Sequence, residues 1–204
     1  TDVGPTTIDV AAKQLRAELE EARQRRALGG FTGLATGWEA LDRQTGGLEI
    51  GGVTYLSAPT KGYKTTTALN FVRAVATRQE RIIRDGVEQL RPQGVIVVEL
   101  EAQPAEIAMG LGCVIGGANR TRFVRGEQTP EDESALEYGM GEYHRLPVVV
   151  ESRTDIDPTM LRARLREARW ELRTKRDAPV RLIVIDTLQL LSTEELAEEV
   201  VRTL

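Results

Sequence analysis

The residues of this sequence that could do chemistry gather around one octapeptide, Ala58-Pro-Thr-Lys-Gly-Tyr-Lys-Thr65. A β-rich run at residues 53–57 precedes it, and apolar residues at helical spacing follow it, which predicts a strand, a loop and a helix. In that arrangement, backbone N–H groups and the positive helix end surround a phosphate. Lys64 would reach the β- and γ-phosphates, and the Thr65 hydroxyl would bind Mg²⁺. The predicted nucleotide-binding residues are Pro59, Thr60, Lys61, Gly62, Tyr63, Lys64, Thr65 and Thr66.

The octapeptide departs from the phosphate-loop pattern G-x-x-x-x-G-K-[ST] at two positions. Ala58 stands at the first glycine, and Tyr63 stands at the glycine before the lysine, with Gly62 one place early. A Cβ at residue 63 is expected to strain the backbone by roughly 1–3 kcal/mol, which would weaken nucleotide binding by about one to two orders of magnitude. The aromatic side chain also leaves open a loop remodelled for another ligand.

Two acidic residues follow apolar runs that predict buried strands. Asp186 ends the run at residues 182–186, where an acid would orient the water shell of Mg²⁺ beside Thr65. Its alternative role is to cap the next turn. Glu101 follows the run at residues 95–100, at the sheet edge where ligands of open α/β sheets bind, and could polarise an attacking water.

Two further polar residues lie beside these acids. Glu99 would share the strand face of Glu101, so one of the two could be only a solvated edge charge, and we favour Glu101 as the catalytic residue. Gln189 could sense a γ-phosphate or couple it to a DNA-binding loop. A plain backbone hydrogen bond is nearly as good an explanation of Gln189.

The predicted elements form an alternating pattern of strands and helices. Strands are predicted at residues 53–57, 95–100, 148–151 and 182–186, and helices begin near Pro104 and Pro130 and span residues 158–175. This alternation indicates an α/β domain with a mainly parallel sheet flanked by helices. The first 30 residues predict a separate helix with a narrow apolar stripe, which either docks on another surface as a linker or packs on its own domain.

Length and composition fit a globular protein with one sizeable core. The chain has 204 residues, a net charge of −4 and a single cysteine. No apolar run approaches the ~20 residues that a membrane span needs, so we expect a cytoplasmic protein without membrane contact. Because the chain is not a polycation, any nucleic-acid contact must come from local loops or an assembled surface.

Four sequence blocks resemble the motor domain of DnaB-family replicative helicases. They are T-G-W-E-A-L-D at residues 36–42, T-G-G-L at 45–48, V-E-L-E-A at 98–102 and I-V-I-D-T-L-Q-L-L at 183–191. The resemblance implies a RecA-like phosphate-loop core over residues 31–204, with the C-terminal part of the core missing, and a linker helix at 1–30. It also implies ATP and Mg²⁺ as ligands and Glu101, Lys64 and Gln189 as catalytic residues.

The same resemblance implies a helicase motor that hydrolyses ATP to translocate on single-stranded DNA during replication. It further implies a ring-shaped homo-oligomer, a hexamer, with primase or a loader as further partners. The alternative is a RecA-like nucleotide-binding module with little hydrolysis that serves assembly, loading or recombination. Tyr63 is the departure that motivates this alternative, and the family's glycine- and arginine-containing DNA-binding loop is not found after the L-Q-L motif.

Overall fold

The computed structural model describes residues 7–27, 32–59, 62–84, 87–153 and 157–186. The chain divides into two compact units, Thr1–Ile50 and Gly51–Leu204. The boundary that the sequence places at residue 30 stays a prediction. None of the helices in the described ranges combines the length and the apolar composition of a membrane-spanning segment.

The first unit contains the predicted N-terminal helix, α1 (Ile8–Ala27), and a short helix, α2 (Glu39–Thr45). Three apolar side chains of the α1 stripe, those of Ile8, Leu15 and Leu19, are exposed. Exposed leucine and isoleucine at helical spacing are typical of a helix that packs against a partner surface. Which surface that is stays a prediction.

The T-G-W-E-A-L-D block at residues 36–42 closes a small buried hydrogen-bonded loop. The backbone N–H and the hydroxyl of Thr36 both donate to the Asp42 carboxylate, at 2.8 and 2.7 Å, and both residues are buried. A buried carboxylate that accepts two hydrogen bonds fixes the chain around it because an unpaired one would be costly. The block therefore has a structural role at the start of α2.

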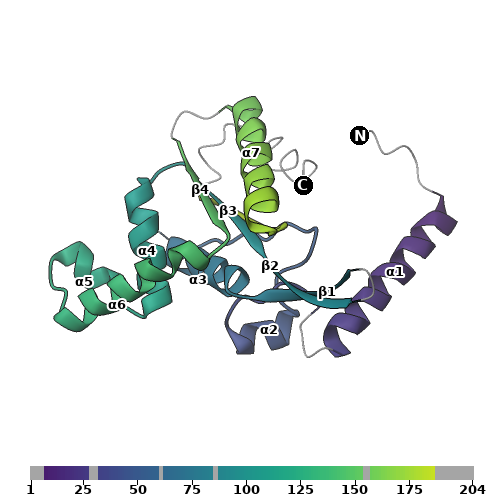
Figure 1. Ribbon diagram of the computed structural model, residues 1–204, viewed down its shortest axis with the longest axis horizontal. Helices are drawn as coiled ribbons and strands as arrows, with labels where there is room; N and C mark the ends of the chain where they lie inside the picture. The colour runs from purple at the N-terminus through teal and green to yellow at the C-terminus, as the bar shows by residue number, and fades with distance from the viewer. Residues whose placement is uncertain (1–6, 28–31, 60–61, 85–86, 154–156, 187–204) are drawn as a thin grey trace. The chain divides into compact units, whose positions relative to one another are not determined.

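The second unit is built on a parallel sheet with the strand order β4-β3-β5 (Figure 1). The strands are β4 (Val148–Ser152), β3 (Gly94–Glu99) and β5 (Val180–Asp186). Ile96 of β3 lies opposite Val149 of β4 and Ile183 of β5. The predicted parallel sheet is thus confirmed, with its three carboxyl ends at one edge.

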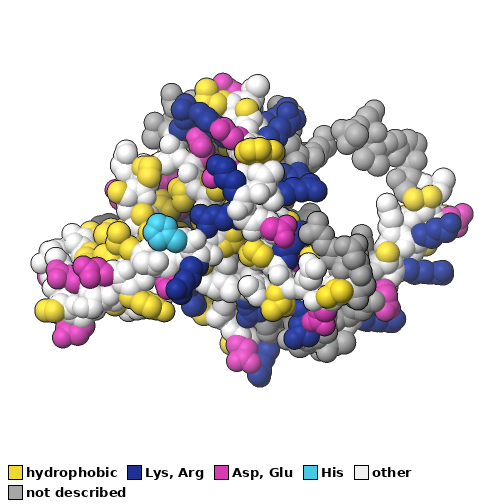
Figure 2. All heavy atoms as spheres, in the orientation of Figure 1, with side chains coloured by type: hydrophobic (Ala, Val, Ile, Leu, Met, Phe, Trp, Pro, Cys, Tyr) yellow, Lys and Arg dark blue, Asp and Glu magenta, His cyan; other side chains and the backbone are white. Residues whose placement is uncertain are grey.

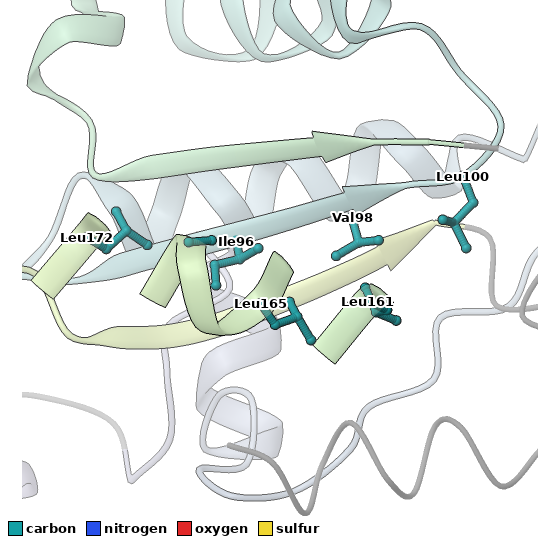
Figure 3. Close-up of a cluster of buried hydrophobic side chains, with 7 residues drawn as sticks. Ile96, Val98, Leu100, Leu161, Leu165 and Leu172 are labelled. Atoms are coloured by element: carbon teal, nitrogen blue, oxygen red, sulfur yellow. The ribbon is translucent and has the colours of Figure 1, made fainter. Parts of the chain in front are cut away.

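Helices cover this sheet and form its hydrophobic core. Every residue of β3 is buried, as the continuous apolar run predicted. Alternate side chains of this segment pack against α7 (Pro158–Arg176), where Figure 3 shows Ile96, Val98 and Leu100 facing Leu161, Leu165 and Leu172. The helix α3 (Lys64–Ala76) contacts β3 and β5, and α4 (Pro104–Gly116) contacts β4.

A helical layer follows α4 and consists of α5 (Arg120–Arg125), α6 (Pro130–Gly141) and a 3₁₀ turn, η1 (Glu142–Arg145). The backbones of α4 and α6 approach so closely that only glycine fits between them. A Cβ at Gly139 would lie 2.1 Å from the carbonyl oxygen of Gly112, which no side chain tolerates. The predicted start of α6 near Pro130 is confirmed, and the side chain of Thr129 caps it by accepting a hydrogen bond from the Asp132 N–H.

Two parts of the second unit differ from the sequence-based expectation. The predicted strand at residues 53–57 is wrong, because this segment is irregular and Val53, Tyr55 and Leu56 are exposed. β-propensity alone does not make a strand, and no strand of the described residues pairs with this segment. Instead, an antiparallel hairpin that was not predicted forms from β1 (Gln79–Arg84) and β2 (Val87–Pro92).

Candidate nucleotide-binding site

The structure brings Thr65 and Asp186 together across 121 residues of sequence. Thr65 is the second residue of α3, and Asp186 is the last residue of β5. The Thr65 hydroxyl donates a hydrogen bond to the Asp186 carboxylate, with Oγ1 and Oδ2 2.6 Å apart. Both side chains are half-buried. A hydroxyl and a carboxylate are therefore held side by side at the start of a helix.

Tyr63 has a strained backbone conformation, as expected for a residue that stands at a glycine position of the phosphate-loop pattern. Its φ of 60° and ψ of 24° lie in the left-handed region, which glycine enters freely and other residues enter at a cost. The ring itself is 69% exposed, so it is not packed in compensation. Tyr63 thus holds a left-handed conformation that glycine would adopt freely, at a cost of roughly 1–3 kcal/mol.

Gly62 does not substitute for the missing glycine at residue 63. Gly62 donates its N–H to the Pro59 carbonyl at 2.8 Å, which closes a tight turn. A Cβ at residue 62 would lie 2.7 Å from that carbonyl oxygen and 2.8 Å from the Cβ of Ala58. Close packing therefore requires glycine at residue 62, whereas Tyr63 is the residue that adopts the left-handed conformation.

The helix α3 begins without a cap from the side chain of its N-cap residue. Tyr63 is the N-cap residue and makes no side-chain hydrogen bond to the first turn. Lys64 is the first helical residue and is half-buried, as are Thr65 and Thr66. Because the first N–H groups of a helix lack partners within it, this end can bind an anion. Thr60, Lys61 and Gln189 lie outside the described residues, and their roles stay predictions.

Glu99 and Glu101 have different environments. Glu99 is buried, and its Oε1 accepts hydrogen bonds from the backbone N–H groups of Glu101 (3.0 Å) and Ala102 (2.8 Å). Burial, with smaller contributions from the negative charges of Asp186 and Glu101, raises the pKa of the Glu99 carboxyl. Glu101 is exposed. The interpretation of Glu99 as a solvated edge charge is therefore wrong: Glu99 shapes the turn that presents Glu101.

The donor set at this edge fits Mg²⁺ only with help from a phosphate-bearing ligand. The described residues include no cluster of three or more His, Cys, Asp or Glu side chains arranged to hold a metal ion. Mg²⁺ typically takes one or two protein oxygen ligands and completes its shell with water and substrate phosphates. The hydroxyl of Thr65 and the carboxylate of Asp186 are oxygen donors of this kind.

Several basic side chains of the described residues pair with acidic ones at the surface. On the face shown in Figure 2, Lys and Arg side chains lie together with acidic ones over α7. Arg164 pairs with Glu167 and Lys175 with Glu171, so this helix face is a solvated, mixed-charge surface. On α5, Arg122 pairs with Asp132 at 3.0 Å.

Comparison with known proteins decides the family. The model of the DnaB-like helicase C-terminal domain family matches residues 33–203. The chain belongs to this family. Among curated proteins, it is 29% identical over 163 residues to the replicative DNA helicase DnaB of Geobacillus stearothermophilus and 27% identical over 173 residues to the replicative DNA helicase DnaC of Bacillus subtilis. These alignments cover 80% and 85% of this chain but only 32% and 34% of the relatives, so the chain spans about a third of their length.

Solved structures confirm the RecA-like fold. One of them, described as an ATPase domain, is 22% identical with a TM-score of 0.66, and the similarity covers 98% of this chain and 67% of that one. The structure of a DnaB-like replicative helicase and its interactions with primase is also 22% identical, with a TM-score of 0.68, and the similarity covers 100% of this chain and 46% of that one. At this identity the likeness shows the fold alone.

Proposed function

We propose that this chain is the ATPase core of a replicative DNA helicase, which hydrolyses ATP to translocate on single-stranded DNA. The observation that carries the proposal is the hydrogen bond between Thr65 and Asp186 at the uncapped start of α3. Membership of the DnaB-like family supports the task, since the relatives it matches are replicative helicases. The whole protein then works in the cytoplasm as a ring-shaped homo-oligomer, a hexamer, with primase or a loader as partner.

The residues divide the reaction between binding and water activation. The N–H groups at the start of α3 and the Lys64 ammonium bind the phosphates of ATP, with Pro59, Thr60 and Lys61 completing the loop. Thr65 and Asp186 would hold Mg²⁺, which when bound neutralises charge on the β- and γ-phosphates. Glu101 orients and deprotonates the attacking water, and Glu99 holds the turn that carries Glu101. Gln189 senses the γ-phosphate.

The exposed ring and left-handed backbone of Tyr63 favour a second candidate function. In this alternative the loop binds nucleotide with little hydrolysis, and the protein serves assembly, loading or recombination. The two functions differ in the effect of restoring glycine at residue 63. A native protein that hydrolyses no ATP, together with a Tyr63→Gly variant that does, would establish the alternative.

The test of the proposed function uses the full-length protein. Its ATPase activity is measured with and without single-stranded DNA, and its unwinding of a forked duplex is measured in parallel. We expect DNA to stimulate hydrolysis and Lys64→Ala to reduce it by about 10²–10³-fold, as for loss of one donor to the transition state. Arg125→Ala, an exposed cation on α5, is the matched control and should leave hydrolysis unchanged. Absence of DNA-stimulated hydrolysis in the native protein would refute the proposal.

A further inference from the structure

A hollow of about 230 Å³ lies beside the start of α3. Tyr63 and Thr66 of the candidate nucleotide-binding site line it. The C-terminal half of α4 and the start of α5, which have no role in the site so far, also line it, with Cys113, Asn119 and Arg120 among their residues. The hollow is smaller than the ~300–1,000 Å³ typical of a whole-ligand pocket, so it can accept only part of a nucleotide.

Arg120 brings a guanidinium with an unpartnered N–H group to this hollow. Its Nε is buried and has no hydrogen-bond partner within the described part of the chain. A Cβ built on Gly110 would lie 3.6 Å from Cζ and Nη1 of Arg120, so the guanidinium rests against the bare backbone of α4. Leaving a buried guanidinium N–H without an acceptor is costly, and such a group in a native structure points to a missing partner.

The other two arginines of α5, Arg122 and Arg125, have different surroundings from Arg120. Arg122 donates to the Asp132 carboxylate at 3.0 Å, so its charge is neutralised within the protein. Arg125 is exposed to solvent in the last turn of the helix. Among the three, Arg120 alone lines the hollow that Tyr63 and Thr66 also line.

We propose that Arg120 is a further nucleotide-binding residue, whose guanidinium donates a hydrogen bond to an oxygen of the phosphate chain held at the start of α3. The inference rests on the proposed function, because the acceptor is the nucleotide that the phosphate loop binds. A guanidinium-to-phosphate hydrogen bond is charge-assisted and strong. Arg120 would thereby add a second cation to the phosphate site besides Lys64.

The test compares three forms of the full-length protein: native, Arg120→Gln and Arg125→Gln. The Kd of a non-hydrolysable ATP analogue is measured by fluorescence titration with Mg²⁺, and inorganic tripolyphosphate is used as a competitor that lacks the nucleoside. We expect Arg120→Gln to raise both the Kd of the analogue and the inhibition constant of tripolyphosphate about tenfold. Arg125→Gln should leave both values within about twofold of native, because that side chain is exposed and distant from the hollow's lining.

The outcomes separate the inference from the proposed function. If the native protein binds neither probe, the proposed function fails and the inference fails with it. If the native protein binds and Arg120→Gln binds equally well, only the inference is overturned. Weaker binding of the analogue with unchanged inhibition by tripolyphosphate would place the contact on the nucleoside, which also overturns it. Thermal unfolding without nucleotide checks that each variant folds. If Arg120→Gln is unstable, Arg120→Lys takes its place in the test. It keeps the charge but lacks the guanidinium, so its affinity for the analogue should be several-fold weaker than that of the native protein.

Discussion

Helices α3 and α6 differ in whether the side chain of the N-cap residue caps the N–H groups of the first turn. At α6, Thr129 and Asp132 form a capping box, and Asp132 also accepts hydrogen bonds from the Asn119 N–H and from Arg122. At α3, the N-cap Tyr63 caps nothing and holds a left-handed backbone conformation. A helix end satisfied by its own side chains stabilises the fold. A helix end left unsatisfied, on strained backbone and beside Asp186, is available to a ligand.

The largest expected effect comes from removing the hydroxyl of Thr65 at the α3 start. Thr65→Ala deletes the donor to Asp186 and the proposed Mg²⁺ ligand. We expect Mg²⁺-dependent ATP hydrolysis to fall by about 10²-fold or more, as for loss of one group that acts on the transition state. Thr65→Ser keeps the hydroxyl and should retain most of the activity. Equal activity of the alanine and serine variants would contradict the assignment.

The next effect concerns the Cβ of Tyr63. Tyr63→Gly removes a Cβ that would crowd a bound phosphate, so we expect the protein to bind an ATP analogue about tenfold more tightly, a gain of roughly 1.4 kcal/mol in binding free energy. Isothermal titration calorimetry would measure the change in Kd. Tyr63→Ala is the matched control because it removes the ring but keeps the Cβ. An equal gain in Tyr63→Ala would show that the ring, and not the Cβ, limits binding.

A smaller effect is expected at the α6 start. Thr129→Ala removes the side chain that accepts from the Asp132 N–H, and should lower the free energy of unfolding by about 1 kcal/mol, the usual cost of losing an N-cap. Urea denaturation would measure this loss. The affinity for nucleotide should not change. A change in the Kd for nucleotide without a loss of stability would contradict the view that the α6 start serves folding and the α3 start serves binding.

The smallest effect is a pH dependence that belongs to α6 alone. Hydrogen bonds from Thr129 and Arg122 hold the pKa of the Asp132 carboxyl far below its ordinary value of about 3.9. A lowered folded-state pKa gives stability that is present above the unfolded-state pKa and is lost as the pH falls toward the folded-state value. The stability difference between the native protein and Asp132→Asn, measured by urea denaturation, should therefore shrink between about pH 5 and pH 2. A constant difference would contradict this.

Where sequence patterns were continuous, the fold could be predicted. The apolar run before Glu101 forms β3, and the helix predicted to begin near Pro130 is α6. Residues 53–57 have the composition of a strand, yet a strand also needs a neighbour, and composition does not supply one. The hairpin β1–β2 was missed although Asp85-Gly86 between its strands is a recognised hairpin signal.

The candidate site was predictable in its residue types and less so in its contacts. Thr65 and Asp186 were paired by their positions after a loop and at a strand end, and the structure places them in hydrogen-bond contact. The burial of Glu99 could not be read from spacing, because its side chain turns back onto the backbone of residues 101 and 102. The hollow at Arg120 is lined by residues of α3, α4 and α5, and the periodicity of a single helix does not encode contacts between helices.

The most direct test of the account is a crystal structure of the protein with a non-hydrolysable ATP analogue and Mg²⁺. We predict that the β-phosphate lies within hydrogen-bond distance of the backbone N–H groups of residues 63–66, with the Lys64 ammonium on the β- and γ-phosphates. The metal ion should lie beside Thr65 and Asp186. An analogue bound elsewhere, with the Thr65–Asp186 hydrogen bond intact and Lys64 directed away from the phosphates, would contradict the account.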